Sequence, residues 1–244
     1  MRVSRIYTDQ PLSALLAVSL EAQKSHYITQ VLRLKVNQTL ILFNGIDPYN
    51  YTAKITKLGK SVDVFIESVS ATQFESPIQT TLYQALSKNE HIDLSIQKCT
   101  ELGVNAVVIF NSERTQIPLK KSKVDKKLLH WQRIAQSACE QCGRSIVPSI
   151  QFMPKFSNTL ELTASKLRIL LDFEGAAIET AINTAKPSGI DILLGAEGGL
   201  SNNEILLAAQ CNFTKVRIGP RILRTETAAI SAMSLVQLLA GDFN

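Results

Sequence analysis

The sequence predicts an α/β protein in two parts: a small β-barrel over residues 1–72 and an α/β domain over residues 73–244. Two patterns predict this division. Short apolar strands separated by turns fill the first part, whereas apolar strands alternate with amphipathic helices in the second. Between them, residues 70–77 (SATQFESP) are rich in Ser, Thr and Pro where the apolar periodicity lapses. We expect a linker at this place.

The first part combines short strands with a positive charge. Strands are predicted at residues 40–43, 51–56 and 62–66. Asn44, Gly45 and Gly59 are typical turn residues and separate these strands. Residues 1–72 carry eight basic and five acidic side chains, so most of the net charge of +5 lies in under a third of the chain. This excess favours a polyanionic partner.

The second part alternates between strands and helices. Strands are predicted at residues 80–86, 106–110, 167–173, 191–194 and 215–218. Helices are predicted at residues 92–102, 124–143, 202–210 and 227–240. Gly103 and Gly241 each follow a helix, a common position for glycine. Because helices alternate with strands, we expect a mainly parallel sheet.

The composition argues against disordered, secreted disulfide-rich and membrane proteins. The chain has 244 residues, of which 45% are hydrophobic and 19% charged, so it can bury a substantial core. No apolar run approaches the roughly 20 residues that span a bilayer. Residues 1–10 also lack the apolar stretch of a signal peptide. We expect a soluble, cytoplasmic protein that does not contact a membrane.

The four cysteines do not predict a metal site. Cys139 and Cys142 form a C-x-x-C pair, but the pair falls inside a predicted helix, and no second C-x-x-C or H-x-x-H completes four ligands. We expect reduced thiols and no metal. A zinc site or a redox pair is the less favoured alternative.

A glycine-rich segment follows the predicted strand 191–194. It reads LGAEGGLSNNE over residues 194–204, and Ser201 and Glu204 have the spacing of a capping box for the next helix. Glycines let a ligand approach the backbone closely, which predicts a ligand loop. The segment is not G-x-G-x-x-G and lacks the Lys of a P-loop, so nicotinamide and ATP lose support. A plain strand-to-helix turn is the alternative.

A second loop of the same design follows the predicted strand 215–218. Residues 216–228 read VRIGPRILRTETA and include Arg221, Arg224 and Glu226. Ligands of open α/β sheets bind beyond the carboxyl ends of the strands, so we expect both loops to face one crevice. A solvated charged turn is the alternative.

Basic residues are concentrated between residues 114 and 133. This stretch contains seven basic side chains and one acidic side chain. Such density predicts salt-dependent binding to nucleic acid, although a solvated face is the common explanation of a charge run. Trp131 lies within it and either stacks on a base or anchors the core. No G-x-S-x-G occurs and the three histidines are scattered, so nucleophilic catalysis has little support.

Taken together, six ordered segments resemble the RsmE family, SPOUT-class methyltransferases that act on N3 of a uridine in 16S ribosomal RNA of the small subunit. The segments are HYITQVLRLK (26–35), QKCTELGV (97–104), SERT (112–115), EQCGRSIVP (140–148), LGAEGG (194–199) and IGPRILRTETA (218–228). The resemblance implies a PUA-like RNA-binding barrel at the N-terminus. It also implies a C-terminal α/β domain with a trefoil knot that binds S-adenosylmethionine, and a homodimer formed through the knot region. Ile230, Met233, Leu235 and Leu238 would then be partly buried against the partner.

The resemblance also implies which residues bind the cofactor. They are Leu171, Asp172, Leu194, Gly195, Glu197, Gly199, Ile218, Gly219, Leu223 and Thr225. The family usually has Pro where this chain has Ala196. Ala does not fix φ as Pro does, but no hydrogen bond is lost, so we expect activity to be retained.

The implied chemistry requires a uridine anion, because N3 of uracil is protonated at neutral pH. A cation near O2 or O4 would stabilise the anion, and a carboxylate would accept the proton. Arg224 and Arg114 are the candidate cations and Glu226 is the candidate acceptor. No metal is required. Candidate phosphate-binding residues are Arg5, Arg33, Lys120, Lys121 and Lys123.

Two other functions stay open at this stage. A non-catalytic RNA-binding protein for ribosome assembly would keep the barrel and the basic stretch but would not bind S-adenosylmethionine. A SPOUT methyltransferase that acts on another RNA position, such as a ribose 2′-hydroxyl, or on tRNA would bind the same cofactor.

Overall fold

The computed structural model describes residues 3–243, which form two compact units. The first unit contains the described residues up to 75 together with residues 136–147, and the second contains residues 76–135 and the remainder from 148 onward. The domain boundary at residue 72 remains a prediction. Residues 136–147 are a later segment of the chain that returns to the first unit. Periodicity along a chain does not report such a return, because it depends on tertiary contacts.

The first unit is built on a five-stranded sheet in the order β1-β3-β4-β5-β2. Its strands are β1 (Ser4–Tyr7), β2 (Ala17–Ser19), β3 (Thr39–Phe43), β4 (Tyr49–Lys57) and β5 (Asp63–Ala71), with the short helices α1 (Ala22–His26) and η1 (Tyr27–Val31) after β2. Every second residue of β4 from Tyr51 to Ile55 is buried in one apolar cluster. The three expected strands are thus present as β3, β4 and β5, and each is longer than its predicted range.

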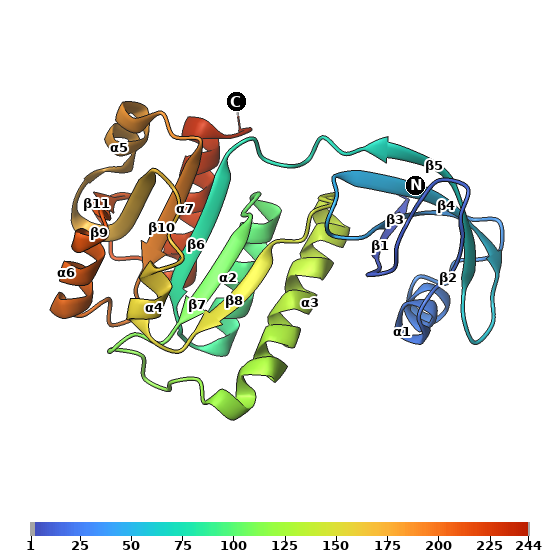
Figure 1. Ribbon diagram of the computed structural model, residues 1–244, viewed down its shortest axis with the longest axis horizontal. Helices are drawn as coiled ribbons and strands as arrows, with labels where there is room; N and C mark the ends of the chain where they lie inside the picture. Colours follow the sequence, from blue (N-terminus) through green and yellow to red (C-terminus); the bar gives the residue numbers. More distant parts are fainter. Residues whose placement is uncertain (1–2, 244) are drawn as a thin grey trace. The chain divides into compact units, whose positions relative to one another are not determined.

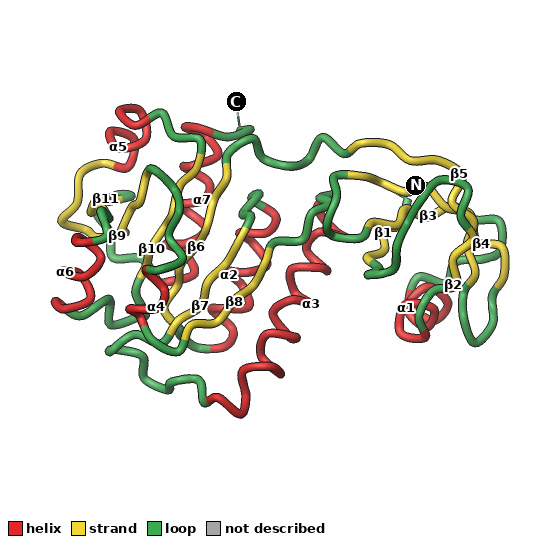
Figure 2. The backbone as a smooth tube through the Cα atoms, in the orientation of Figure 1, coloured by secondary structure: helices red, strands yellow, loops and turns green. Residues whose placement is uncertain are grey.

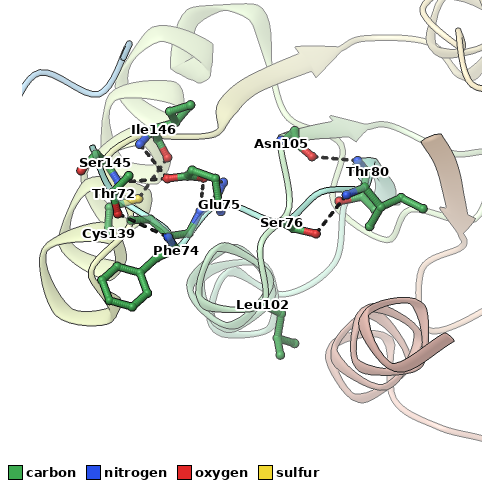
Figure 3. A network of polar contacts seen from close by, with 12 residues as sticks. Thr72, Phe74, Glu75, Ser76, Thr80, Leu102, Asn105, Cys139, Ser145 and Ile146 are labelled. Carbon is green, nitrogen blue, oxygen red and sulfur yellow. Dashed lines mark hydrogen bonds and ion pairs between the residues drawn. The ribbon is translucent and has the colours of Figure 1, made fainter. Parts of the chain in front are cut away.

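Residues 136–147 are joined to the rest of the first unit by partly buried polar contacts. Oε1 of Glu75 accepts hydrogen bonds from the backbone N–H groups of Ser145 (2.9 Å) and Ile146 (3.0 Å) (Figure 3). The other carboxylate oxygen accepts from Nε of Arg144 at 2.9 Å, and Arg144 is only 2% exposed. A charge buried to this extent needs such a partner.

The second unit is built on a six-stranded parallel sheet in the order β11-β9-β10-β6-β7-β8 (Figures 1 and 2). Its strands are β6 (Gln79–Ala85), β7 (Ala106–Phe110), β8 (Ser149–Met153), β9 (Leu167–Ala177), β10 (Gly189–Leu194) and β11 (Thr214–Arg217). The expected parallel sheet is confirmed. Strand β8 was not predicted, because only the side chains of Ile150, Phe152 and Met153 give it an apolar pattern.

Seven helices of the described chain belong wholly or partly to this unit. They are α2 (Asn89–Glu101), η2 (Lys121–Lys123), α3 (Val124–Cys142), α4 (Phe156–Leu160), α5 (Ile178–Ala185), α6 (Asn202–Gln210) and α7 (Thr225–Ala240). Helix α7 packs against α2, α5 and β10, whereas α4 packs against α6 and β7. Leu193 of β10 belongs to the apolar cluster that also contains Phe156 of α4 and Ala208 of α6.

Gln237 of α7 ties together three parts of the second unit. It is fully buried, its Oε1 accepts a hydrogen bond from Oγ of Ser76 (2.8 Å), and its Nε2 donates to the carbonyl of Leu102 (2.7 Å). Gly103 has a φ of +88°, and a Cβ there would lie 2.9 Å from Nε2 of Gln237. Glycine at the end of α2 is therefore required both by the backbone conformation and by the space that Gln237 occupies.

Strand β9 bulges away from β11 just where the site forms. Lys215 pairs with Leu170, but the next residue, Val216, pairs with Ala176, so residues 171–175 leave the ladder. A Cβ on Gly175 would overlap the backbone of Lys215 and Val216. The missing side chain at Gly175 lets the two backbones approach, and it leaves residues 171–174 free to form a wall.

The chain then returns from β11, at the edge of the sheet, to α7, which contacts the inner strand β10 and helix α2. The trefoil knot implied by the family resemblance remains a prediction. Met233, expected at a dimer interface, is fully buried within the protomer, because α7 presents that side chain to its own unit.

No helix between residues 3 and 243 has the length and apolarity needed to cross a membrane. Within the same range, no group of three or more His, Cys, Asp or Glu side chains is arranged to hold a metal ion. Burial raises the pKa of the Cys139 thiol to about 12, so this thiol stays protonated at neutral pH.

Candidate functional site

Three segments of the second unit enclose a pocket of about 480 Å³ near the carboxyl ends of β10 and β11. The segments are residues 170–174 at the β9 bulge, residues 194–200 at the end of β10 and after it, and residues 215–223 of β11 and the loop that follows. All ten residues predicted to bind the cofactor line this pocket: Leu171, Asp172, Leu194, Gly195, Glu197, Gly199, Ile218, Gly219, Leu223 and Thr225. The two expected loops thus face one crevice, and the β9 bulge completes it.

Residues 196–199 form a tight turn, which we call the glycine turn. The backbone N–H of Gly199 donates to the carbonyl of Ala196 at 2.8 Å, and Gly199 has a φ of +71°, which favours glycine. A Cβ on Gly195 would lie 2.5 Å from the carbonyl carbon of Gly199, so this position also requires glycine. Ala196 is buried and its carbonyl closes the turn, which Ala achieves without the ring of Pro.

The predicted capping box at the start of α6 is confirmed. Oγ of Ser201 accepts from the backbone N–H of Glu204 (3.2 Å), and the Glu204 carboxylate accepts from the backbone N–H of Ser201 (2.8 Å). The second carboxylate oxygen of Glu204 accepts from the backbone N–H of Glu113 at 2.9 Å. The glycine turn is thereby fixed to the segment that carries Arg114.

Glu197 is held at the corner of the glycine turn by partners at the start of α2. Its Oε1 lies 3.3 Å from Nδ1 of His91 and accepts from the backbone N–H of Lys88 at 3.5 Å. Burial acts to raise the pKa of Glu197, but backbone N–H groups and His91 outweigh burial and hold that pKa below its usual range. Glu197 therefore stays ionised at neutral pH.

His91 was not recognised from the sequence. Its Nδ1 lies 3.6 Å from Oε2 of Glu226 as well as 3.3 Å from Glu197, so it stands between two carboxylates. Glu197 is 106 positions away along the chain. No local pattern could have linked these residues, because only the packing of α2 beside the turn and α7 brings them together.

The β9 bulge contributes an ion pair to the pocket wall. Nζ of Lys215 lies 2.7 Å from Oδ2 of Asp172 and 3.6 Å from Oε2 of Glu174. Partial burial acts to raise the pKa of Asp172, but Lys215 and the backbone N–H of Glu174 lower it to below its ordinary value. Lys215 and Glu174 line the pocket too and were missed in the sequence, where nothing distinguished them from ordinary surface charges.

Of the three candidate catalytic residues, one lines the pocket and two do not. Arg114 is exposed, lines the pocket, and donates from Nη1 to the carbonyl of Gly198 at 2.7 Å. Arg224 is the exposed N-cap residue of α7. Glu226 is 7% exposed and contacts Thr225 and His91. The structure thus brings Arg114 to the pocket, whereas Arg224 and Glu226 lie near its edge on α7 without lining it.

The candidate RNA-binding residues fall in both units. Arg33 is exposed with a φ of +53°. Arg5 is half-buried and donates to Oδ1 of Asn50 (2.6 Å) and Oγ of Ser145 (3.1 Å), so its guanidinium also stabilises the first unit. Three further candidates are exposed in and before η2: Lys120, Lys121 and Lys123. Trp131 of α3 is fully buried, which agrees with a core anchor rather than an exposed stacking platform.

Comparison with known proteins identifies the family. Residues 74–237 match the model of an RNA methyltransferase domain, and residues 20–67 match an RNA methyltransferase PUA domain. Ribosomal RNA small subunit methyltransferase E of Buchnera aphidicola from Schizaphis graminum is 36% identical, over 100% of this chain and 99% of the relative. The chain belongs to the ribosomal RNA small subunit methyltransferase E family. The expected PUA-like N-terminal domain and C-terminal α/β methyltransferase domain are thereby confirmed.

Solved structures of this family have the same fold. A methyltransferase E from Neisseria gonorrhoeae, bound to S-adenosyl methionine, is 33% identical, with a TM-score of 0.91 over 100% of both chains. A structure from Legionella pneumophila, in complex with the bound cofactor SAM, is 34% identical, with a TM-score of 0.93 over 100% of both chains. At this similarity the two solved structures share the fold of this chain.

Proposed function

We propose that this protein transfers a methyl group from S-adenosylmethionine to N3 of a uridine in 16S ribosomal RNA of the small subunit. The observation that carries the proposal is the convergence of the β9 bulge, the glycine turn and the loop 218–223 on one pocket. Relatives in the family are named ribosomal RNA small subunit methyltransferase E, and two structural neighbours hold the cofactor.

The pocket fits this cofactor in size and in surface chemistry. A volume of about 480 Å³ lies within the usual range for small-molecule sites. Gly219 has a φ of +129°, and a Cβ there would meet no atom within 4 Å, so the pocket keeps open space beside that backbone. Glu197 and the cluster of Asp172, Glu174 and Lys215 give the lining groups of both charges, which suits a ligand that carries a sulfonium, an ammonium and a carboxylate group. When bound, the cofactor supplies an electrophilic methyl group.

The side chains of this protein must prepare the uridine for attack. N3 loses its proton and the resulting charge spreads to O2 and O4, where a cation stabilises it. Arg114 is the candidate that lines the pocket, and its hydrogen bond to Gly198 orients the guanidinium. Arg224 is the second candidate cation. Glu226 is the candidate acceptor for the proton, and its Oε2 lies 3.6 Å from Nδ1 of His91 beside the pocket.

We propose that residues 1–72 bind RNA together with the lysines at η2, and that residues 73–244 carry out catalysis. The matches to a PUA domain and a methyltransferase domain support this division. We also propose a knotted C-terminal region and a homodimer through it. Leu238 of α7 is 50% exposed, and Ile230 and Leu235 are half-buried, which leaves apolar surface for a partner. A cytoplasmic location follows from a ribosomal substrate.

Nucleoside mapping tests the proposal. Small-subunit ribosomal RNA from a strain that lacks the gene is incubated with the purified protein and S-adenosylmethionine, then digested and analysed by mass spectrometry. The expected product is one N3-methyluridine per RNA. Methylation of a ribose or of another base would assign a different RNA position. No methylation, together with no cofactor binding, would favour a non-catalytic RNA-binding protein.

A further inference from the structure

A second pocket, of about 700 Å³, borders the first within the second unit. Its walls come from the end of β6 and the start of α2, from residues 115–120, and from the first half of α3. Glu197 lines both pockets. A molecule in the second pocket would therefore lie beside the same carboxylate that borders the cofactor pocket.

Three residues that line this second pocket each hold a buried polar atom with no hydrogen-bond partner in the described part of the chain. These atoms are Oγ of Ser87, Oδ1 of Asp93 and Nε1 of Trp131. Trp131 is fully buried, and the other carboxylate oxygen of Asp93 is fixed 2.8 Å from Nε2 of His130. Buried polar groups are normally paired, because an unpaired one costs free energy. The cluster points to a ligand that supplies the missing partners.

The chemistry of the lining suits a nucleotide. An indole N–H and a hydroxyl can donate to the O2 and O4 acceptors of uracil, and a carboxylate can accept from a ribose hydroxyl. The lining also contains Lys88, Lys120, Lys123 and Lys127, whose ammonium groups suit the flanking phosphates. Nζ of Lys127 lies 5.8 Å from the centroid of the Trp131 ring, so at least one of these lysines lies beside the buried polar atoms.

We infer that the second pocket receives the unstacked uridine that is to be methylated, with its uracil near Ser87, Asp93 and Trp131 and its phosphates on the lysines. This inference rests on the proposed function and adds the site of the base to it. The pocket volume lies within the usual range for a small-molecule site. Because Glu197 lines both pockets, a base in the second pocket would lie next to the methyl donor.

Fluorescence tests the location of the base directly. The chain has one tryptophan, so its intrinsic emission reports on Trp131. Uridine 5′-monophosphate is titrated into the full-length protein, with inorganic phosphate in a parallel titration. The expected result is a saturable change in emission with the nucleotide and none with phosphate. An equal response to phosphate would mean that the pocket recognises phosphate alone, and no response to the nucleotide would mean that the base binds elsewhere. Either result overturns the inference.

Two variants separate this inference from the proposed function. Ser87→Ala and Asp93→Asn each remove part of the polar cluster, and Ser157→Ala and Asp242→Asn are the matched controls at exposed positions. We expect each pocket variant to raise KM for ribosomal RNA about tenfold. Calorimetry should give the same Kd for S-adenosylmethionine in all four variants, and the controls should keep the wild-type KM.

The possible failures are distinguishable. If both pocket variants keep the wild-type KM while the wild-type protein methylates RNA, the second pocket is not the base site and the proposed function stands. If the wild-type protein neither binds the cofactor nor methylates RNA, the proposed function fails and the inference fails with it. The thermal unfolding midpoint of each variant checks that Asp93→Asn is folded, and Ser87→Ala, the smaller change, carries the test if it is not.

Discussion

Nδ1 of His91 lies 3.3 Å from Oε1 of Glu197 and 3.6 Å from Oε2 of Glu226, so one imidazole stands between two carboxylates of the site. Glu197 belongs to the glycine turn and Glu226 to the first turn of α7. A cationic or hydrogen-bonding group between two carboxylates offsets their repulsion. His91 of α2 therefore positions Glu197, the residue that lines both pockets. The same imidazole links Glu197 to Glu226.

Replacement of Gly219 by Val should abolish cofactor binding. A β-branched side chain is strained at a φ of +129° and would occupy open space in the pocket. We expect Kd for S-adenosylmethionine, measured by calorimetry, to rise by more than about a hundredfold. Gly59→Val is the matched control, because Gly59 is exposed and a Cβ there meets only the carbonyl oxygen of Ser61, at 3.7 Å. Unchanged affinity of Gly219→Val would remove this loop from the site.

Replacement of Gly175 by Ala should destabilise the second unit. The added methyl group would overlap the backbone of Lys215 and Val216, so β11 must move. We expect the free energy of unfolding, from denaturant titration, to fall by about 1–3 kcal/mol. Cofactor affinity should fall as well, because the displaced residues line the pocket. A variant as stable as Gly59→Ala would show that the bulge is not constrained by this contact.

The exposed lysines before α3 should contribute to RNA affinity. Simultaneous reversal of Lys120, Lys121 and Lys123 to Glu should weaken RNA binding and reduce the slope of log K against log salt by about one for each phosphate that is no longer neutralised. Cofactor affinity should not change, since none of the three lines the cofactor pocket. Filter binding over a range of salt concentrations measures the slope.

A charge-matched variant controls for the loss of net charge. It reverses three exposed lysines elsewhere in the second unit: Lys155, Lys166 and Lys186. We expect a smaller loss of RNA affinity and a slope close to that of the wild type. Equal losses in the two triple variants would mean that overall charge, rather than the lysines before α3, governs binding.

The ion pair between Asp172 and Lys215 should make stability depend on pH. The pKa of Asp172 is lowered from 3.8 in the folded protein, so its contribution is fully present above that value and is lost as pH falls through the folded pKa. The pKa of Lys215 is raised from 10.5 by Asp172, so its contribution is present below 10.5 and is lost at higher pH.

Asp172→Asn tests this dependence by thermal unfolding. The variant should unfold about 1–3 °C below the wild type at neutral pH, because the pair is only partly buried. The difference should shrink below about pH 4 as Asp172 of the wild type becomes protonated. Glu161→Gln, at an exposed position, should show no such trend. A difference that stays constant from pH 7 to pH 3 would contradict the account.

Local patterns in the sequence predicted the parts of the site that depend on local structure. The glycines of LGAEGG and the Ser201–Glu204 spacing predicted a strand, a turn and a capped helix, because backbone conformation and capping are decided within a few residues. The segments 194–199 and 218–225 were expected to face one crevice because parallel strands end at one edge of a sheet. Both loops do line one pocket.

Features that depend on tertiary packing could not be predicted in this way. Strand 167–173 was expected to end at Phe173, whereas β9 continues through the bulge to Ala177, because Gly175 packs on β11. His91 and Glu197 come together only when α2 lies beside the turn. The unpartnered atoms near Trp131 can likewise be found only once the side chains around them are placed.

We expect the glycine turn, the loop 218–225 and the β9 bulge together to bind S-adenosylmethionine. The decisive measurement is a crystal structure of this protein grown with S-adenosylmethionine. Electron density for one cofactor is expected in the pocket bounded by Glu197, Gly219 and Asp172. Density for the cofactor at another place, or an empty pocket at saturating concentration, would contradict it.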